Sequence, residues 1–284
     1  MIRIGLVDVT TSHADAFAKI FNVEKKFEGF QVTACWDTDA KRCEEVAKAY
    51  GLKSVLLLDE MTDVDAVMVL SRNQDRHLEY AEPFLKRGLP TFVDKTTAGS
   101  LQQALAMYRL ARRKKAPIFS ASAVRFGREI QEAKQVMREK MGPIRFITAS
   151  GPGELIFYGQ HVFDTLYELV GRGARTVRNI GDEKTAILKI VYESGLTVVA
   201  TISDVGKLPF RFTVADEKIN HMFVVSDYGY YYAKMMEAFV TMVQTGQPPF
   251  DPLETVEIID GMFQAKASRE KGGREMKIKG DYRI

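Results

Sequence analysis

The first 120 residues alternate short apolar stretches with longer amphipathic ones. The apolar stretches predict strands at residues 2–7, 31–36, 55–58, 66–70, 91–93 and 117–120. The amphipathic stretches predict helices at residues 14–21, 39–50, 75–86 and 101–113. Strands separated by helices of about 10–15 residues are typical of parallel βαβ units with right-handed crossovers. We therefore predict an α/β architecture that begins with a Rossmann-type domain on a parallel sheet over residues 1–120.

The pattern changes after residue 120. Helices are predicted at residues 127–141, 161–170, 231–245 and 253–267, and strands at 144–150, 186–192, 197–203, 211–214 and 222–226. Several of these strands alternate apolar and polar positions, as half-buried antiparallel strands do. The prediction is a C-terminal α+β domain over residues 121–284, with a mostly antiparallel sheet that serves substrate binding and oligomerisation.

Composition narrows the possible partners. A length of 284 residues suits two domains, and 46% hydrophobic with 27% charged residues is typical of a globular protein. A net charge of +3 is too small to indicate a nucleic acid or an anionic membrane as partner. No segment approaches the ~18 apolar residues of a membrane span, and the N-terminus does not resemble a signal peptide. The two cysteines cannot form a disulfide framework or a zinc site, so we expect a reducing cytoplasm.

The turn after the first strand is where a Rossmann fold carries glycines that let the backbone approach a pyrophosphate. Asp8, Thr10 and His13 occupy these three positions. Their side chains narrow the approach, and a carboxylate at residue 8 repels a phosphate at short range. The hydroxyls of Thr10, Thr11 and Ser12 have two open interpretations: they bind an anion at the start of the next helix, or they only cap that helix.

Asp37 stands at the end of the second predicted strand. In this fold a carboxylate at that place binds the ribose hydroxyls of the cofactor and repels the 2′-phosphate of NADP. This interpretation favours NAD over NADP. The alternative is that Asp37 caps the helix that follows.

Further motifs carry a resemblance to a known family. Ser71, Arg72, Asn73 and His77 follow the fourth strand, and Asp94-Lys95 follows the fifth. The second half contributes Gly159-Gln160-His161 and the run Gly246-Gln247-Pro248-Pro249. In order and spacing these segments resemble the Pro-Asn…His, Glu-Lys-Pro and Asp-x-Gly-x-His motifs of the Gfo/Idh/MocA oxidoreductases, which include glucose–fructose oxidoreductase and inositol dehydrogenase. The resemblance covers nearly the whole chain.

The resemblance implies an NAD(P)-dependent oxidoreductase that acts on a sugar, polyol or related small hydroxylated molecule. It implies that Lys95 polarises the reacting oxygen and that His161 exchanges its proton. It also implies a homo-oligomer that pairs through the C-terminal sheet. The cofactor contacts predicted from the turn, from Asp37 and from the resemblance are Asp8, Thr10, Thr11, Ser12, His13, Asp37, Ser71, Arg72, Asn73, His77, Asp94 and Lys95.

Two departures from the family pattern matter. Phe157 stands where the family has an aspartate four residues before the histidine; Asp164, one helical turn beyond His161, is the third predicted catalytic residue because it can orient the imidazole. Thr96 replaces the proline after the lysine, so we expect a trans peptide bond there. No metal site is predicted. The alternative to an enzyme is a non-catalytic descendant that binds a ligand or a partner.

Overall fold

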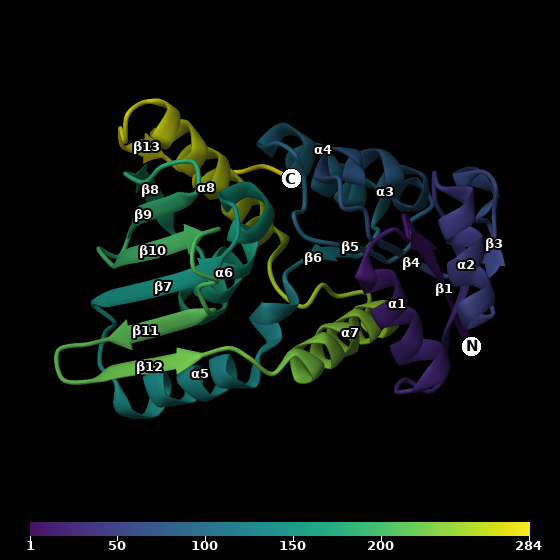
Figure 1. Ribbon diagram of the computed structural model, residues 1–284, viewed down its shortest axis with the longest axis horizontal. Coiled ribbons are helices and arrows are strands. Elements are labelled where there is room, and N and C mark those ends of the chain that lie inside the picture. Colours follow the sequence, from purple (N-terminus) through teal and green to yellow (C-terminus); the bar gives the residue numbers. More distant parts are fainter. The chain divides into compact units, whose positions relative to one another are not determined.

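The computed structural model describes residues 1–284, and the chain divides into two compact units. The first unit comprises Met1–Ser120, Met235–Pro252 and Ile284. The second comprises Ala121–Lys234 and Leu253–Arg283. Figure 1 shows a sheet with helices in each unit.

The first unit contains a six-stranded, fully parallel sheet in the order β3-β2-β1-β4-β5-β6. Its strands are β1 (Ile2–Val7), β2 (Phe30–Trp36), β3 (Lys53–Ser54), β4 (Ala66–Val69), β5 (Thr91–Val93) and β6 (Ile118–Ser120). The strand order reverses at β1, between β2 and β4. The predicted Rossmann-type parallel sheet is confirmed, and a ligand site is expected where the order reverses.

The helices of this unit are α1 (Ser12–Ala18), which continues as a π-helical turn over Lys19–Val23, α2 (Ala40–Tyr50), α3 (His77–Lys86) and α4 (Leu101–Lys114). Short 3-10 turns cover Leu58–Glu60 and Gln74–Arg76. Local chemistry sets some of these boundaries. The carboxylate of Asp39 accepts from the amides of Lys41 and Arg42 at 3.1 and 3.2 Å and so caps α2. Gly51, with φ +69°, ends that helix in the left-handed conformation.

The third strand lies elsewhere than predicted. It is only Lys53–Ser54, and the apolar run at residues 55–58 leaves the sheet. Leu56 and Leu57 are 80% and 64% exposed, and their amides donate to the Glu60 carboxylate at 3.2 Å. The prediction failed because an apolar run resembles a buried strand, whereas here the edge of the sheet has already been reached.

The second unit contains a seven-stranded sheet in the order β12-β11-β7-β10-β9-β8-β13. Its strands are β7 (Phe146–Pro152), β8 (Ala174–Asn179), β9 (Thr185–Tyr192), β10 (Thr197–Ser203), β11 (Arg211–Ala215), β12 (Asn220–Val224) and β13 (Met276–Lys277). Only β7 and β10 pair in parallel, which confirms a mostly antiparallel sheet. Strands β8 and β13 were not predicted, because one is interrupted by arginines and the other is two residues long.

The helices of the second unit are α5 (Arg128–Lys140), α6 (Leu155–Val170), α8 (Pro252–Glu270) and the first part of α7 (Tyr228–Thr245), with a 3-10 turn at Ala123–Phe126. Helix α6 packs on β7 and β10 and begins six residues before the predicted start. Its N-cap is Glu154, whose carboxylate accepts from the amides of Ile156 and Phe157 at 3.0 Å. Sequence inspection missed this start because glutamate is a less common cap than serine or aspartate.

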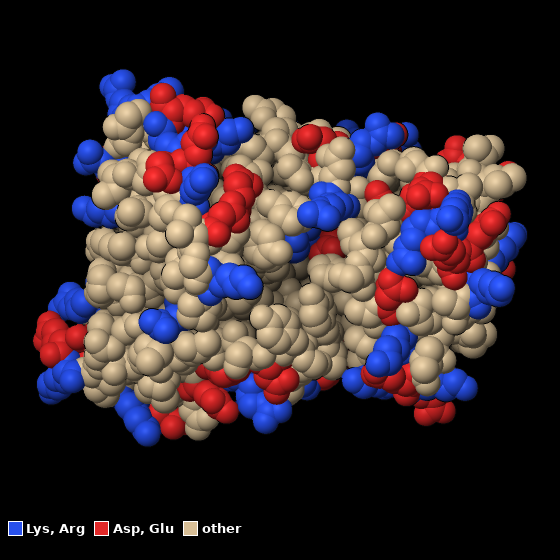
Figure 2. All heavy atoms as spheres, in the orientation of Figure 1, with Lys and Arg blue, Asp and Glu red and all other residues tan.

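The other face of this sheet is not covered by the helices of its own unit. Along β7, Ile147 and Ala149 are buried, whereas Phe146, Thr148 and Ser150 point to the opposite side. Figure 2 shows an expanse with few charged side chains over β7, β10 and β11. None of the helices combines the length and apolar character that crossing a bilayer requires.

Candidate active site

In the first unit, predicted site residues follow the carboxyl ends of four neighbouring strands. Asp8 follows β1, Asp37 follows β2, Ser71 comes shortly after β4, and Asp94 follows β5. Because all these strands are parallel, their carboxyl ends meet at one edge of the sheet. The structure therefore brings these predicted cofactor residues to a common edge.

Asp8 adopts a backbone conformation that usually belongs to glycine, with φ +61°. Its amide donates to the carbonyl of Trp36 at 2.8 Å, and its carboxylate accepts from the hydroxyl of Thr10 at 2.6 Å. The turn thus keeps the backbone form of the missing glycine, while the acidic side chain is held toward Thr10.

Of the two open interpretations of these hydroxyls, the one that has them cap α1 is not observed at the N-cap residue, Thr11. Thr11 occupies the N-cap position, but its hydroxyl donates to the carbonyl of Leu70 at 3.3 Å and accepts nothing from the first helical turn. The capping interpretation fails for Thr11 because the end of β4 offers an acceptor within reach. Thr10 and Ser12 are exposed at the start of the helix.

Asp37 is buried and fastens the end of β2 to the turn after β1. One carboxylate oxygen accepts from the amide of Val9 at 2.6 Å, and the other accepts from the amide of Asp39 at 2.8 Å. Burial raises the pKa of Asp37, and the negative charges of Asp8 and Asp39 act in the same direction against these hydrogen bonds. A carboxylate offers about four acceptor positions, so these two bonds leave acceptor capacity for a ligand hydroxyl.

The loops after β4 and β5 are joined through a buried histidine. His77 has Nε2 at 2.8 Å from the carbonyl of Ser71 and Nδ1 at 3.1 Å from the carbonyl of Thr97. Asn73 starts the turn between them, since its side chain accepts from the amide of Asp75 at 3.0 Å. His77 therefore positions the loops that carry Ser71, Arg72 and Lys95, of which Arg72 is exposed.

Asp94 and Lys95 form a charged pair at the carboxyl end of β5. Asp94 is buried, its carboxylate contacts Nδ1 of His13, and it accepts from the amide of Lys95 at 2.8 Å. Burial opposes ionisation of Asp94, but His13 and Lys95 outweigh it, and the pKa of Asp94 is lowered. Burial lowers the pKa of Lys95, with a smaller contribution from Arg72, while Asp94 opposes that shift. A lysine of lowered pKa at a strand end is suited to proton exchange.

The peptide bond between Lys95 and Thr96 is cis. The expectation of a trans bond, drawn from the missing proline, was wrong. A non-proline cis bond is disfavoured by a finite free energy and is not forbidden.

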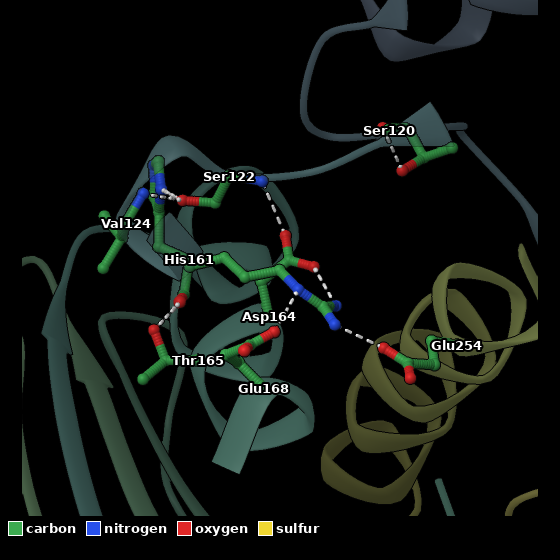
Figure 3. A network of polar contacts seen from close by, with 10 residues as sticks. Ser120, Ser122, Val124, His161, Asp164, Thr165, Glu168 and Glu254 are labelled. Carbon is green, nitrogen blue, oxygen red and sulfur yellow. Dashed lines mark hydrogen bonds and ion pairs between the residues drawn. The ribbon is translucent and has the colours of Figure 1, made fainter. Parts of the chain in front are cut away.

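In the second unit, His161 lies on α6 with its ring 5.2 Å, between centroids, from the rings of both Tyr158 and Phe210. Its Nδ1 lies 2.5 Å from the hydroxyl of Ser122. Figure 3 shows these two side chains directed at each other. Tyr158 and Phe210 restrict the ring from its sides, and Ser122 engages one of its two nitrogens.

Asp164 does not contact His161 directly. It is fully buried, and its carboxylate accepts from the amide of Ser122 at 2.7 Å (Figure 3). The expected direct contact between Asp164 and the imidazole is replaced by one through Ser122, because the Asp164 side chain is directed at the turn that follows β6. Burial raises the pKa of Asp164 to about 7, although Arg125 and the Ser122 amide favour the ionised form.

A buried arginine holds the network around Asp164. The guanidinium of Arg125 lies 3.0 Å from the Glu168 carboxylate, 2.6 Å from that of Glu254 and 3.8 Å from that of Asp164. Glu154, near His161 in the sequence, caps α6 through its side chain. No group of three His, Cys, Asp or Glu side chains is arranged to hold a metal ion.

Ser122 was missed from the sequence. It lies two residues beyond β6, so its position after the carboxyl end of a parallel strand was the available signal. Its partner His161 is 39 residues away in the chain, and no local pattern links them.

Comparison with known proteins is consistent with this geometry. Residues 3–122 match the sequence profile of an oxidoreductase family with an NAD-binding Rossmann fold. The chain is similar over its whole length to the structure of myo-inositol dehydrogenase from Lactobacillus casei in complex with NAD(H) and myo-inositol, with 15% identity, 98% of that chain covered and a TM-score of 0.85.

Two further structures are similar. Scyllo-inositol dehydrogenase from Lactobacillus casei, with bound NAD(H) and scyllo-inositol, shares 15% identity over 98% of this chain and 99% of its own, with a TM-score of 0.83. A probable dehydrogenase from Thermotoga maritima shares 19% identity over 97% and 98%, with a TM-score of 0.82. At these identities the likeness establishes the fold. No functionally curated protein matches the chain.

Proposed function

We propose that the chain, whose residues 3–122 match the NAD-binding Rossmann domain of the Gfo/Idh/MocA oxidoreductases, is an NAD-dependent oxidoreductase that acts on a sugar, polyol or related small hydroxylated molecule. The observation that carries the proposal is the Asp94-Lys95 pair at the carboxyl end of β5. It supplies a half-buried amine of lowered pKa in the unit whose residues match an NAD-binding fold. The inositol dehydrogenases of similar fold act on substrates of this class.

The residues at the strand ends fit a dinucleotide. Asp8 retains the left-handed backbone of the glycine it replaces, and its carboxylate is drawn to Thr10. Asp37 retains acceptor capacity for ribose hydroxyls, and its charge disfavours a 2′-phosphate, which supports NAD over NADP. Bound NAD supplies the hydride acceptor. Thr10, Ser12 and Arg72 are exposed near the same edge of the sheet.

Lys95 and His161 are the proposed catalytic pair at the substrate oxygen. Oxidation of a carbinol removes a proton from oxygen, so a group able to accept one near neutral pH is required. Burial lowers the pKa of Lys95 in that direction, and the imidazole of His161 supplies a second polar contact to the same oxygen. Asp164 supports His161 through Ser122.

The rival proposal is a non-catalytic descendant that uses the same fold to bind a ligand or a partner. It is favoured by Phe157, which stands where the family carries an aspartate, and by side chains at the three glycine positions of the turn. The two proposals differ in a measurable property, the affinity for NADH.

The open face of the second unit supports a homo-oligomer. Phe146, Ile187 and Met222 are exposed on strands β7, β9 and β12, and the surface over β7, β10 and β11 carries few charges (Figure 2). Faces of this kind are suited to pairing with another copy. We also propose a reducing cytoplasm, since Cys35 and Cys43 are free thiols.

Titration of the purified protein with NADH and NADPH, followed by calorimetry, tests the function first. The oxidoreductase predicts saturable binding, tighter for NADH. A panel of inositols, aldoses and sugar acids, assayed for NADH formation at 340 nm, then identifies the substrate class. Absence of binding for both dinucleotides would contradict the oxidoreductase and leave the rival.

A further inference from the structure

Ser122 has every polar group of its main chain and side chain engaged. Its amide donates to the Asp164 carboxylate at 2.7 Å, and its carbonyl accepts from the amide of Arg125 at 3.1 Å. Its hydroxyl oxygen accepts from the amide of Val124 at 3.1 Å and lies 2.5 Å from Nδ1 of His161. The serine is fully buried. Its position is therefore fixed from several directions (Figure 3).

These contacts determine the direction of the hydrogen bond to His161. A serine hydroxyl has one proton and two lone pairs, and Val124 already uses one lone pair. The only acceptor in the structure for the hydroxyl proton is Nδ1 of His161. If Nδ1 were the donor instead, the hydroxyl proton would be buried without an acceptor, which is unfavourable.

We propose that Ser122 is a positioning residue that fixes neutral His161 in the tautomer with its proton on Nε2. Nδ1 accepts from the serine, so Nε2 carries the N–H and presents a donor. This arrangement is the reverse of a histidine whose Nδ1–H is held by a carboxylate and whose Nε2 is free to accept a proton. Asp164 contributes by holding the Ser122 amide and has no direct contact with the ring.

This inference rests on the proposed function in one respect, the chemical role it gives His161. A neutral imidazole with its proton on Nε2 donates a hydrogen bond to the substrate oxygen and cannot accept the carbinol proton there. That proton would then pass to the Lys95 amine while the hydride on the carbinol carbon goes to the NAD of the proposed function, which leaves the ammonium form of Lys95 and the carbonyl oxygen held by His161. Substrate orientation is thus assigned to His161, and proton exchange to Lys95.

The tautomer can be measured without cofactor or substrate. The chain has four histidines, so selective ¹⁵N-histidine labelling gives few signals, and His161→Gln assigns those of residue 161. Long-range ¹H–¹⁵N spectra at a pH where the ring is neutral distinguish protonated from unprotonated nitrogens. We expect a protonated Nε2 and an unprotonated Nδ1 in the unmodified protein.

Ser122→Ala removes the donor and should raise the ratio of the Nδ1–H to the Nε2–H form about fivefold, the effect of one hydrogen bond of about 1 kcal/mol. Ser122→Thr keeps the hydroxyl and should keep the ratio of the unmodified protein. Thr165→Val is the matched control, because the Thr165 hydroxyl donates to the main-chain carbonyl of His161 at 3.1 Å and does not contact the ring.

A proton on Nδ1 in unmodified neutral His161 would overturn the proposal, even if the alanine variant does not fold. An unchanged ratio in folded Ser122→Ala would overturn it as well. Failure of NADH binding would remove the proposed function and leave the tautomer result standing, so the two failures are distinguishable. With an active substrate, Ser122→Ala should lower kcat, while Ser122→Thr should restore it.

Discussion

The carboxylate of Asp37 accepts a hydrogen bond from the main-chain amide of Val9 at 2.6 Å, which ties the end of β2 to the turn after β1. The same carboxylate also holds the amide of Asp39. Asp37 therefore shapes the turn after β1, and the proposed function also gives it the role of repelling a 2′-phosphate. A substitution that removes the acceptor therefore changes both the turn and the charge. A substitution that retains an acceptor changes only the charge.

Asp37→Asn keeps an acceptor for Val9 and removes the charge. We expect NADH to bind the unmodified protein more tightly than NADPH. The substitution should reduce the ratio of the two dissociation constants about tenfold, since the repulsion toward the 2′-phosphate is lost. Asp37→Ala should also reduce this ratio but should weaken the binding of both cofactors, because the buried Val9 amide loses its acceptor. Calorimetric titration measures both dissociation constants in each protein. Equal affinities for the two cofactors in the unmodified protein would exclude this role for Asp37.

Asp8→Gly should tighten NADH binding. Repulsion between a carboxylate and a phosphate at 4–6 Å is roughly 3–4 kcal/mol at an effective dielectric near 20. About a third of this repulsion should remain after screening by salt and after the hydrogen bond between Asp8 and Thr10. Glycine also suits the φ of +61° better than aspartate does.

Asp8→Asn separates these two effects, because it removes the charge and keeps a side chain. If charge dominates, the asparagine and glycine variants should gain similar affinity. Unchanged or weaker NADH binding in both variants would show that Asp8 serves the turn and does not oppose the cofactor.

Asp164 should make the protein less stable as pH rises from about 4 to 7. Its pKa in the folded state is about 7, above the ordinary value of about 3.9, so the folded state binds more protons in this window. The stability gained from the protonated form is complete below the ordinary pKa and is lost as the pH rises through 7. At about 1.4 kcal/mol per pKa unit, the upper bound is about 4 kcal/mol.

Asp164→Asn removes this titration and keeps an acceptor for the Ser122 amide. Urea unfolding at pH 5 and pH 8 should show a smaller loss of unfolding free energy for the variant than for the unmodified protein. Equal pH dependence in the two proteins would mean that Asp164 is ionised at both pH values.

Most of the fold could be predicted from the sequence because its signals are local. The buried strand Ala66–Val69 is entirely apolar, and the Asp39 cap and Gly51 mark the two ends of α2. The edge strand β3 was misplaced because nothing local distinguishes an apolar run that leaves a sheet from one that stays.

The candidate site was predictable only where a residue's role follows from its place at a strand end. Asp37 and the Asp94-Lys95 pair could be found in that way. Ser122 could not, because its role depends on a contact with His161 that only the folded chain creates. The left-handed backbone of Asp8 was equally hidden, since aspartate rarely adopts it and the turn imposes it.

The proposed oxidoreductase requires Lys95 and His161 to act on one substrate oxygen. Lys95→Met and His161→Gln should each lower kcat about 10²–10⁴-fold, the usual scale for a positioned acid, base or hydrogen-bond donor, with little change in NADH affinity. Lys95→Arg keeps the positive charge but cannot become a neutral amine, so it tests whether Lys95 exchanges a proton. If it does, the arginine variant should be nearly as slow as the methionine variant. Because burial lowers the pKa of Lys95, oxidation by the unmodified enzyme should speed up through a midpoint below the ordinary value of about 10.4 as pH rises.

The double variant decides whether the two residues share a substrate oxygen. If they act as a unit, Lys95→Met combined with His161→Gln should cost much less than the product of the two single losses. If each acts elsewhere, the losses should multiply. Single-turnover rates with saturating NAD measure the chemical step directly, and calorimetry on the same variants checks that cofactor binding survives. Multiplicative losses, or a His161→Gln variant with unchanged kcat, would remove His161 from the catalytic pair and leave Lys95 to act without it.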